Sequence, residues 1–280
     1  MFYLLKCFIQ MKILLNNSDL NEALNGVSKI GFVPTMGSIH EGHKSLIRKS
    51  KNDCKKTLVS IFINPTQFNS KNDFLNYPKN FKKDLRVLKN LRVNYVFMPK
   101  YRHVYNFKRK SKIKLRKKDK ILCAKFRRGH FEGVIDVMDR LTKLINPQKI
   151  FMGEKDFQQL HLLKRYITNK YKSKIVSCKT IRNKAKVALS SRNNLLNKKQ
   201  LVLAGKLAQS LFIFKKRLNK KKDFKKIFND KKKELNKLFN IKIEYLELRN
   251  IFDLSISTDV KNSKLFIAYY LNKIRLIDNF

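Results

Sequence analysis

The chain has 280 residues but only eight glycines, five prolines and four cysteines. No long stretch rich in Pro, Gly and Ser interrupts it, so we expect no flexible linker. The cysteines stand singly, at Cys7, Cys54, Cys123 and Cys178, and the lack of a CxxC pair argues against a zinc or redox site. We predict four reduced, mostly buried thiols.

Acidic residues are also scarce: 65 Lys and Arg face 20 Asp and Glu, a formal charge of +45. Such a charge favours nucleic-acid binding. However, no RNP-like motif, zinc-finger spacing or RGG tract is present, and lysine is abundant throughout, with Asn, Ile and Phe, whose codons are AT-rich. We attribute the charge to an AT-rich genome and expect no specific nucleic-acid partner. The best local candidate is 108–118, where Ile113 and Leu115 alternate with lysines as on a half-exposed strand.

No apolar run approaches the roughly 20 residues that a membrane-spanning helix needs. The apolar residues 1–9 lack a basic n-region and a small-residue cleavage site, so they do not resemble a signal peptide. Met11 offers an alternative start. We expect a cytoplasmic protein without a membrane partner.

Strands alternate with helices over the first 180 residues. Short apolar runs predict buried parallel strands at 30–33, 57–63, 95–98, 149–152 and 174–178. Amphipathic patterns between them predict helices at 44–52, 79–91, 134–145 and 157–167. This alternation is typical of an α/β domain with a doubly wound parallel sheet, which binds its ligand beyond the carboxyl ends of the strands.

The pattern changes after about residue 180. It predicts helices near 203–218 and 222–239, then strands near 241–245, 264–270 and 274–277. We therefore predict two domains: 1–180 is Rossmann-like and binds the ligand, and 181–280 is a smaller α+β lid domain.

The most specific motif is PTMGSIHEGH at residues 34–43, between a predicted strand and a helical pattern. Backbone N–H groups of such a turn and the positive end of the helix dipole can hold a phosphate. Two histidines can add hydrogen bonds or charge. An HExxH metal site is excluded, because the histidine spacing is three instead of four. A turn with incidental histidines is the alternative.

Amide and histidine side chains follow further predicted strands. Asn64 and Gln67 come where Pro65 ends a strand, so we expect them to be exposed at the ligand edge of the sheet. Their amides suit a substrate with hydroxyls and a carboxylate; a plain Asn-Pro turn is the alternative. In the segment Gly129-His130-Phe131-Glu132-Gly133, two glycines mark a turn into a helix. Either the turn with His130 contacts the substrate, or it only forms the helix entry and His130 has a structural role.

Two later segments combine charge with tight turns. Gly153 lets the backbone approach a ligand, Lys155 can meet a phosphate, and Asp156 can cap a helix or help to hold a ribose or a metal. Gln159 faces the same side in the first helical turn. In Leu189-Ser190-Ser191-Arg192-Asn193, hydroxyls beside an arginine form a second candidate anion clamp.

In this order and spacing, the five segments closely resemble the pantothenate synthetase (pantoate–β-alanine ligase) family of the HxGH nucleotidyltransferases. The resemblance covers nearly the whole chain, to the closing Arg275-Leu276-Ile277-Asp278-Asn279. It implies a homodimer and a two-step reaction. Pantoate attacks the α-phosphorus of ATP, with Mg²⁺ required, and β-alanine displaces AMP from the resulting pantoyl adenylate. A related ligase for another acid and a nucleic-acid-binding protein on the same fold are the alternatives.

The resemblance also implies residue roles. It makes His43 a proton donor and His40 a phosphate contact, and we place Lys155 with them as catalytic. It assigns ATP binding to Met36, Gly37, Ser38, Ile39, His40, Glu41, Gly42, His43, Gly153, Glu154, Lys155, Asp156, Ile181, Leu189, Ser190, Ser191 and Arg192. Pantoate and β-alanine are assigned to Gln67 and Gln159, to which we add Asn64. No protein metal site is implied, because ATP carries the Mg²⁺.

Some positions depart from the family pattern. Ala185-Lys186 stands where Asp-Gly is common, so a tight turn is altered or charge is added near the triphosphate. Cys123-Ala124 stands where Glu-Gly is common. No residue that the resemblance makes essential is lost, and we expect a diverged but active enzyme.

Overall fold

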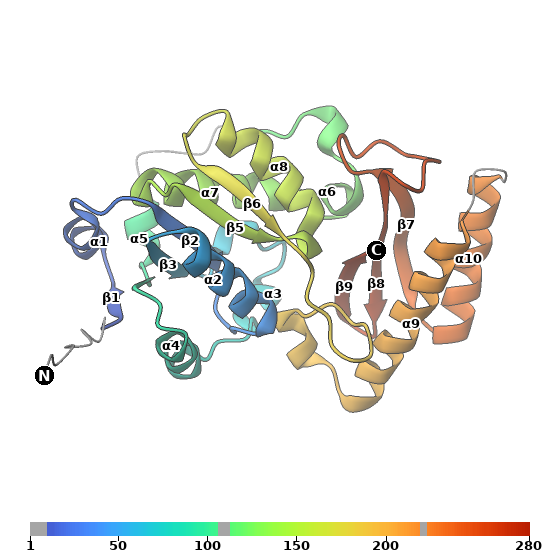
Figure 1. The fold of residues 1–280 in the computed structure, drawn as a ribbon. Helices are drawn as coiled ribbons and strands as arrows, with labels where there is room; N and C mark the ends of the chain where they lie inside the picture. The colour runs from blue at the N-terminus through green and yellow to red at the C-terminus, as the bar shows by residue number, and fades with distance from the viewer. Residues whose placement is uncertain (1–9, 106–112, 219–222) are drawn as a thin grey trace, which may run out of the picture. The chain divides into compact units, whose positions relative to one another are not determined.

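A computed structural model describes residues 10–105, 113–218 and 223–280 (Figure 1). The chain divides into two compact units, each considered by itself. The first comprises Met1–Leu115, Arg128–Met152 and His161–Cys178, and the second comprises Arg116–Arg127, Gly153–Leu160 and Lys179–Phe280. The chain passes between the units several times, so each unit collects segments that are distant in sequence.

The first unit is built on a six-stranded sheet in the order β1-β4-β3-β2-β5-β6 (Figure 1). The pairs β1–β4, β4–β3, β3–β2 and β2–β5 are parallel, which confirms the predicted parallel sheet. From β2 the chain adds β3 and β4 on one side and later adds β5 and β6 on the other side. The winding therefore reverses at β2, and ligands bind at such switch points. The strands are β1 (Lys12–Leu14), β2 (Ile30–Thr35), β3 (Lys56–Ile61), β4 (Tyr95–Phe97), β5 (Lys149–Gly153) and β6 (Lys174–Cys178).

The central strands are buried on both faces. Phe32 and Val33 of β2 and Leu58 and Val59 of β3 have no exposed surface, as expected for neighbouring residues of a parallel strand that is covered on each side. The helices that begin in this unit are α1 (Asn17–Leu24), α2 (Glu41–Asp53), α3 (Lys71–Leu75), α4 (Phe81–Asn90), α5 (Tyr101–Val104) and α7 (His130–Ile145). α2 packs on β2 and β3 and thereby fixes the start of the histidine segment.

Three predicted features of this unit are wrong. β2 continues through Pro34, which lies opposite Ser60 of β3 although its nitrogen carries no proton. α7 begins at His130, so the predicted turn into the helix is already its first turn. The strand predicted around Ile113 and Leu115 is absent from described residues 113–118, and 108–112 lie outside the described part.

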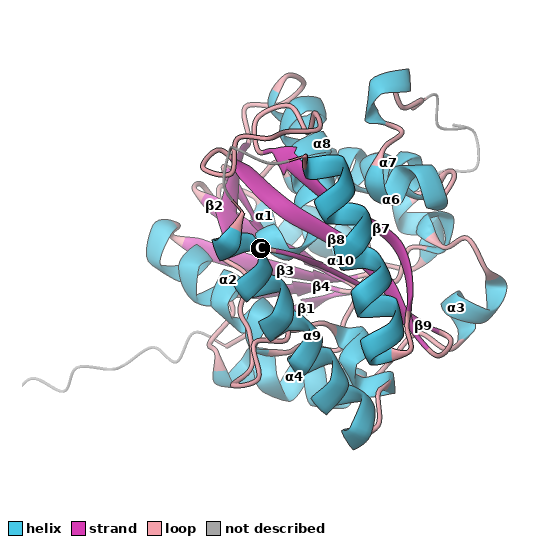
Figure 2. Ribbon diagram, turned by 90° about the vertical axis from the view of Figure 1, so that its right-hand side faces the viewer, coloured by secondary structure: helices cyan, strands magenta, loops and turns pink. Residues whose placement is uncertain are grey.

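The second unit contains a three-stranded antiparallel sheet in the order β7-β8-β9 and two long helices that lie side by side (Figure 2). The strands are β7 (Lys242–Asn250), β8 (Ser263–Leu271) and β9 (Ile274–Asn279). The helices are α6 (Leu122–Phe126), α8 (Phe157–Thr168), which ends in the first unit, α9 (Lys198–Arg217) and α10 (Phe224–Phe239). Buried Leu211, Leu235 and Ile267 join helices and sheet in one core. The predicted α+β module is confirmed.

A tight hairpin over 181–189 precedes α9. The N–H of Leu189 donates to the carbonyl oxygen of Ile181 at 3.0 Å, and the N–H of Lys186 donates to that of Asn183 at 2.9 Å. Lys186 has a φ of +69°, in the left-handed region that favours glycine. The turn is therefore kept without the glycine that the resemblance implies at this position, and Lys186 adopts a conformation that costs an L-residue about 1–2 kcal/mol.

Replacing Lys186 by glycine is expected to stabilise the chain. Lys186→Gly should raise the free energy of unfolding by about 1 kcal/mol and the Tm by roughly 2–4 °C, because the backbone strain disappears. Lys186→Ala is the control, since it removes the charge and keeps the strain. Thermal unfolding of the three proteins checks this, and an equal rise in both variants would show that charge is the cause.

Candidate active site

A buried carboxylate from a distant helix holds the turn after β2. Asp84 of α4 is 2% exposed, and its two oxygens accept the N–H groups of Ser38 and Ile39, each at 2.8 Å. Gly37 and Ser38 have φ angles of +83° and +53°, and the N–H of Gly37 donates to Thr35 Oγ1 at 3.1 Å. Asp84 therefore fixes the segment that leads into α2.

His40 and His43 cap α2 by exchanging hydrogen bonds. His40 is the N-cap, and its Nδ1 accepts the N–H of Gly42 at 3.1 Å. Nδ1 of His43 accepts the N–H of His40 at 3.4 Å, and the rings stack with centroids 4.0 Å apart. Because each Nδ1 accepts a hydrogen bond, each neutral ring carries its own proton on Nε2. The cap thus sets both imidazoles as Nε2–H donors.

The glycine between the histidines is a requirement of this cap. A Cβ at Gly42 would lie 2.8 Å from Cε1 and 2.9 Å from Nδ1 of His40. Those separations are shorter than real contacts of a Cβ, so any side chain at this position would displace the ring that caps the helix.

The sequence predicts that backbone N–H groups of this turn point at a phosphate. Four of these groups instead donate hydrogen bonds to side chains of the protein. Those of Ser38 and Ile39 donate to Asp84, and those of His40 and Gly42 donate to the histidine rings. In their neutral form both rings carry a hydrogen-bond donor on Nε2, and the N-terminus of α2 adds the positive end of the helix dipole. Any capacity of this turn to bind phosphate therefore lies in its side chains.

Asn64 caps the 3-10 turn η1 (Pro65–Gln67) that follows β3. It is 1% exposed, so the predicted exposure of its side chain at the sheet edge is wrong. Its Oδ1 accepts the hydroxyl of Tyr105 at 2.9 Å, and its Nδ2 donates to the carbonyl oxygen of Gly133 at 3.2 Å and to Oε1 of Gln67 at 3.3 Å. Burial raises the pKa of Tyr105, which keeps the phenol protonated as a donor.

Gln67 is held from several elements of the first unit. Its Nε2 donates to Sδ of Met36 at 2.8 Å, and its carbonyl oxygen lies 2.6 Å from Nδ1 of His130 at the start of α7. A Cβ at Gly133 would meet a carbonyl oxygen of η1, so α7 can lie this close only with glycine there. The structure thus brings the ends of β2 and β3 together with the start of α7, and it gives His130 a structural contact.

In the second unit, the turn predicted to bind ATP follows β5 as the 3-10 turn η3 (Glu154–Asp156). Nζ of Lys155 lies 3.3 Å from the carboxylate of Asp156, which is half exposed. The carbonyl oxygens of Glu154 and Lys155 both accept hydrogen bonds from Nδ2 of Asn279, at 2.9 Å each. The backbone that carries Lys155 is therefore fixed by the last strand of the chain.

The predicted anion clamp lies in the same unit. Ser190 caps the 3-10 turn η4 (Ser191–Leu195), and its Oγ accepts the N–H of Arg192 at 3.3 Å. The hairpin brings Ile181 beside Leu189. Gln159 lies half-buried in the first turn of α8.

The predicted site residues thus fall into two sets, each gathered within one unit. The first unit holds Met36–His43 with Asn64 and Gln67, and the second holds Gly153–Asp156, Gln159, Ile181 and Leu189–Arg192. Within the described ranges, no three His, Cys, Asp or Glu side chains are grouped so that they could hold a metal ion. No helix in those ranges is long and apolar enough to cross a membrane. Cys123 is buried, Cys54 and Cys178 are half-buried, and none of these three forms a disulfide.

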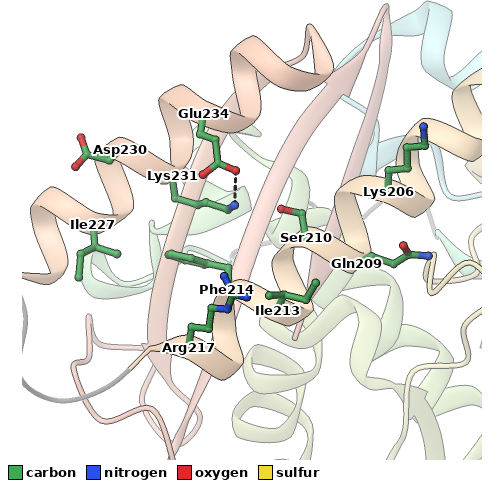
Figure 3. A pocket seen from close by; sticks show the side chains of 10 residues that line it. All are labelled: Lys206, Gln209, Ser210, Ile213, Phe214, Arg217, Ile227, Asp230, Lys231 and Glu234. Atoms are coloured by element: carbon green, nitrogen blue, oxygen red, sulfur yellow. Dashed lines mark hydrogen bonds and ion pairs between the residues drawn. The ribbon is translucent and has the colours of Figure 1, made fainter.

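A cavity of about 820 Å³ lies between α9 and α10 in the second unit (Figure 3). Ser210 and Phe214 of α9 and Ile227 of α10 line it. On α10, Nζ of Lys231 forms a salt bridge with Glu234 at 2.6 Å. It contains none of the predicted site residues.

The winding of the sheet, with an HxGH helix cap after its central strand, defines a nucleotide-binding α/β protein of the HxGH nucleotidyltransferase class. The family model described as pantoate-beta-alanine ligase matches residues 12–280. The chain belongs to this family.

Individual relatives agree along their whole length. The chain is 36% identical to the pantothenate synthetase of Campylobacter hominis over 273 residues, which are 96% of this chain and 99% of the relative. Among solved structures, pantothenate synthetase from Thermus thermophilus is similar with a TM-score of 0.89 at 27% identity, covering 96% of this chain and 99% of that one. Pantoate-beta-alanine ligase from Francisella tularensis, complexed with beta-gamma ATP and beta-alanine, is similar with a TM-score of 0.82 at 33% identity, covering 97% of each chain.

Sequence reasoning missed the residues that hold the predicted site in place. Asp84 lies 46 residues from Ser38, and Asn279 lies 124 residues from Lys155. A partial signal existed for Asp84, since an acid is unusual in the lysine-rich helix of so basic a chain. For Asn279 no local pattern indicates a contact with η3.

Removing the charge of Asp84 is expected to loosen the histidine turn. An asparagine can accept only one of the two N–H groups and turns its own NH₂ toward the other, so Asp84→Asn should lower the free energy of unfolding by about 2 kcal/mol. Thermal unfolding and faster hydrogen exchange at the Ser38 and Ile39 amides would report this. Asp230→Asn, at an exposed position of α10, is the control, and unchanged exchange in Asp84→Asn would contradict the assigned role.

Proposed function

We propose that this chain is a ligase that condenses pantoate with β-alanine, at the expense of ATP, to form pantothenate. The observation that carries the proposal is the two-histidine cap after the central strand, in a chain that belongs to the pantoate-beta-alanine ligase family. Two Nε2–H donors at a helix N-terminus suit a phosphoryl group on which negative charge accumulates.

The proposed reaction passes through pantoyl adenylate. The pantoate carboxylate attacks the α-phosphorus of ATP, and the bond to pyrophosphate breaks. The amine of β-alanine then attacks the acyl carbon, and AMP leaves with the electron pair of the acyl–oxygen bond. Since no covalent bond to the protein forms, catalysis depends on positioning and on electrostatic stabilisation.

The histidines and the second-unit segments are proposed to act on the phosphates. His43, which is proposed as the proton donor, donates a hydrogen bond to the phosphoryl group through Nε2–H, and His40 adds a second hydrogen bond. Lys155 supplies a positive charge, and the Ser190–Arg192 loop clamps the remaining phosphates. The other residues proposed to contact ATP are Met36, Gly37, Ser38, Ile39, Glu41, Gly42, Gly153, Glu154, Asp156, Ile181 and Leu189.

Gln67 and Gln159 are proposed to bind pantoate, and Gln67 also β-alanine. An amide can donate to a carboxylate and accept from a hydroxyl, which matches the groups of pantoate. Asn64 supports this role through its hydrogen bond to Oε1 of Gln67 at 3.3 Å.

The remaining features of the proposal concern the metal, the assembly and the organisation. Mg²⁺ is proposed to arrive with the triphosphate, since Mg²⁺ in such sites is commonly held by substrate phosphates with few carboxylates. The carboxylate of Asp156, which lies 3.3 Å from Nζ of Lys155, suits such a role. The homodimer, the cytoplasmic location and the division into a 1–180 binding domain and a 181–280 lid domain stay predictions.

An assay of AMP formation tests the function directly. AMP and pyrophosphate should form when pantoate, β-alanine, ATP and Mg²⁺ are all present, and pyrophosphate exchange should need only pantoate, ATP and Mg²⁺. A folded chain that supports neither reaction would refute the proposal. A panel of other carboxylic acids separates this function from that of a related ligase.

Truncation of the two glutamines should affect the acid selectively. Gln67→Ala and Gln159→Ala are each expected to lower kcat/KM for pantoate by roughly 10- to 100-fold, since hydrogen bonds to a charged group are lost, and to leave the KM for ATP almost unchanged. Gln148→Ala, at an exposed position of the first unit, is the matched control. Equal losses toward ATP and pantoate would mean that these side chains serve the fold instead.

A further inference from the structure

The last strand of the chain contacts the turn that carries Lys155. Asn279 of β9 is 3% exposed, and both protons of its Nδ2 are used, one on the carbonyl oxygen of Glu154 and one on that of Lys155. A single amide therefore fixes two consecutive peptide groups of η3. A salt bridge between Lys264 and Glu154, at 3.2 Å, holds the same turn from β8.

A buried ion pair holds Asn279 in turn. The guanidinium of Arg182 forms two parallel hydrogen bonds with the carboxylate of Asp278, both at 2.7 Å. The same carboxylate accepts the N–H of Asn279 at 2.7 Å. The guanidinium of Arg182 also lies over the rings of Phe212 and Phe280, 5.0 and 4.8 Å from their centroids. The hydrogen bonds hold the edge of the guanidinium plane, and the two rings pack against its face.

The same arginine anchors the hairpin that leads into the anion clamp. Nη1 of Arg182 donates to the carbonyl oxygen of Lys186 at 2.8 Å, across the hairpin, and Nη2 donates to that of Asn279 at 2.7 Å. The hairpin passes directly into Leu189 and the Ser190 cap of η4. One guanidinium therefore connects η3, through β9, with the Leu189–Arg192 loop.

We propose that Arg182, Asp278 and Asn279 are positioning residues that hold Lys155 and the Leu189–Arg192 loop in the arrangement that binds the triphosphate of ATP. This inference rests on the proposed function, because that function assigns both segments to ATP. A buried ion pair is by itself a weak source of stability, whereas fixed geometry of charged groups around a phosphate has a large effect on binding and rate. The three residues act through the backbone of η3 and of the hairpin.

The decisive variant is Asn279→Ala, which removes the two hydrogen bonds to η3 and leaves the pairing of β9 intact. Its dissociation constant for the non-hydrolysable β,γ-methylene analogue of ATP with Mg²⁺, measured by calorimetry, is expected to rise about 10- to 100-fold. The KM for ATP should rise with it, while the KM for pantoate stays unchanged. Arg182→Lys keeps the charge but loses the planar fork, and we expect it to lie between wild type and Asn279→Ala.

Two controls separate positioning from a loss of stability. Asn262→Ala removes the same side chain from an exposed loop of the unit, and Leu235→Ala weakens the core on α10, which carries none of the three positioning residues. Both should bind the analogue as the wild type does at temperatures where they are folded. If Leu235→Ala weakens binding as much, relative to its fall in Tm, as Asn279→Ala does, the role is structural and the inference fails.

The outcomes also separate this inference from the proposed function. Wild-type affinity in Asn279→Ala and Arg182→Lys overturns the inference and leaves the ligase function standing. A wild-type chain that binds the analogue but forms no AMP overturns the ligase function, and the comparison of dissociation constants still decides the inference. A wild-type chain that does not bind the analogue overturns both.

Discussion

The exchange of hydrogen bonds between His40 and His43 is the interaction on which the site of the first unit depends. It caps α2, and the same contacts fix the tautomer of both rings. The cap can form only with glycine at position 42, and its entry segment is held by Asp84. The same two rings meet a structural need through Nδ1, which accepts backbone N–H groups at the start of the helix, and a chemical one through Nε2–H, which is an oriented donor.

Acidic residues are few in this chain, which has 20 Asp and Glu against 65 Lys and Arg, so the place of each carboxylate is informative. Excess positive charge favours expansion of the chain through self-repulsion. Some acids are nevertheless withdrawn from solvent at defined places. Buried Asp84 accepts two backbone N–H groups, buried Asp278 pairs with Arg182, and half-buried Glu244 pairs with Arg275 at 2.7 Å. Burial raises the pKa of Asp278, against the opposing effect of Arg182, so this carboxylate depends on its partner to stay charged. Exposed lysines are solvated and need no such partners. Their large number is therefore consistent with the attribution of the charge to an AT-rich genome.

Much of the fold could be predicted from the sequence, since continuous apolar runs and their spacing determine parallel strands and helices. The errors have local physical causes. Pro34 ends no strand because a single missing donor is tolerated within β2, and His130 starts α7 because Gly129, with a φ of +79°, supplies the helix entry. The chemical motifs were visible, but the burial of Asn64 was not, because it results from Tyr105 and Gly133, which are distant in sequence.

The two sets of site residues share one principle: short local motifs carry the chemical groups, and remote polar side chains fix the backbone beneath them. Asp84 does so for the histidine turn, and Asn279 does so for the turn of Lys155. In both cases the remote group bonds to the backbone of the motif. A peptide group held at its N–H or carbonyl oxygen cannot rotate when a highly charged triphosphate arrives, and the cost of ordering the site is met during folding. This explains how the hairpin over 181–189 is kept although Lys186 is strained: the carbonyl oxygen of Lys186 is held by Arg182.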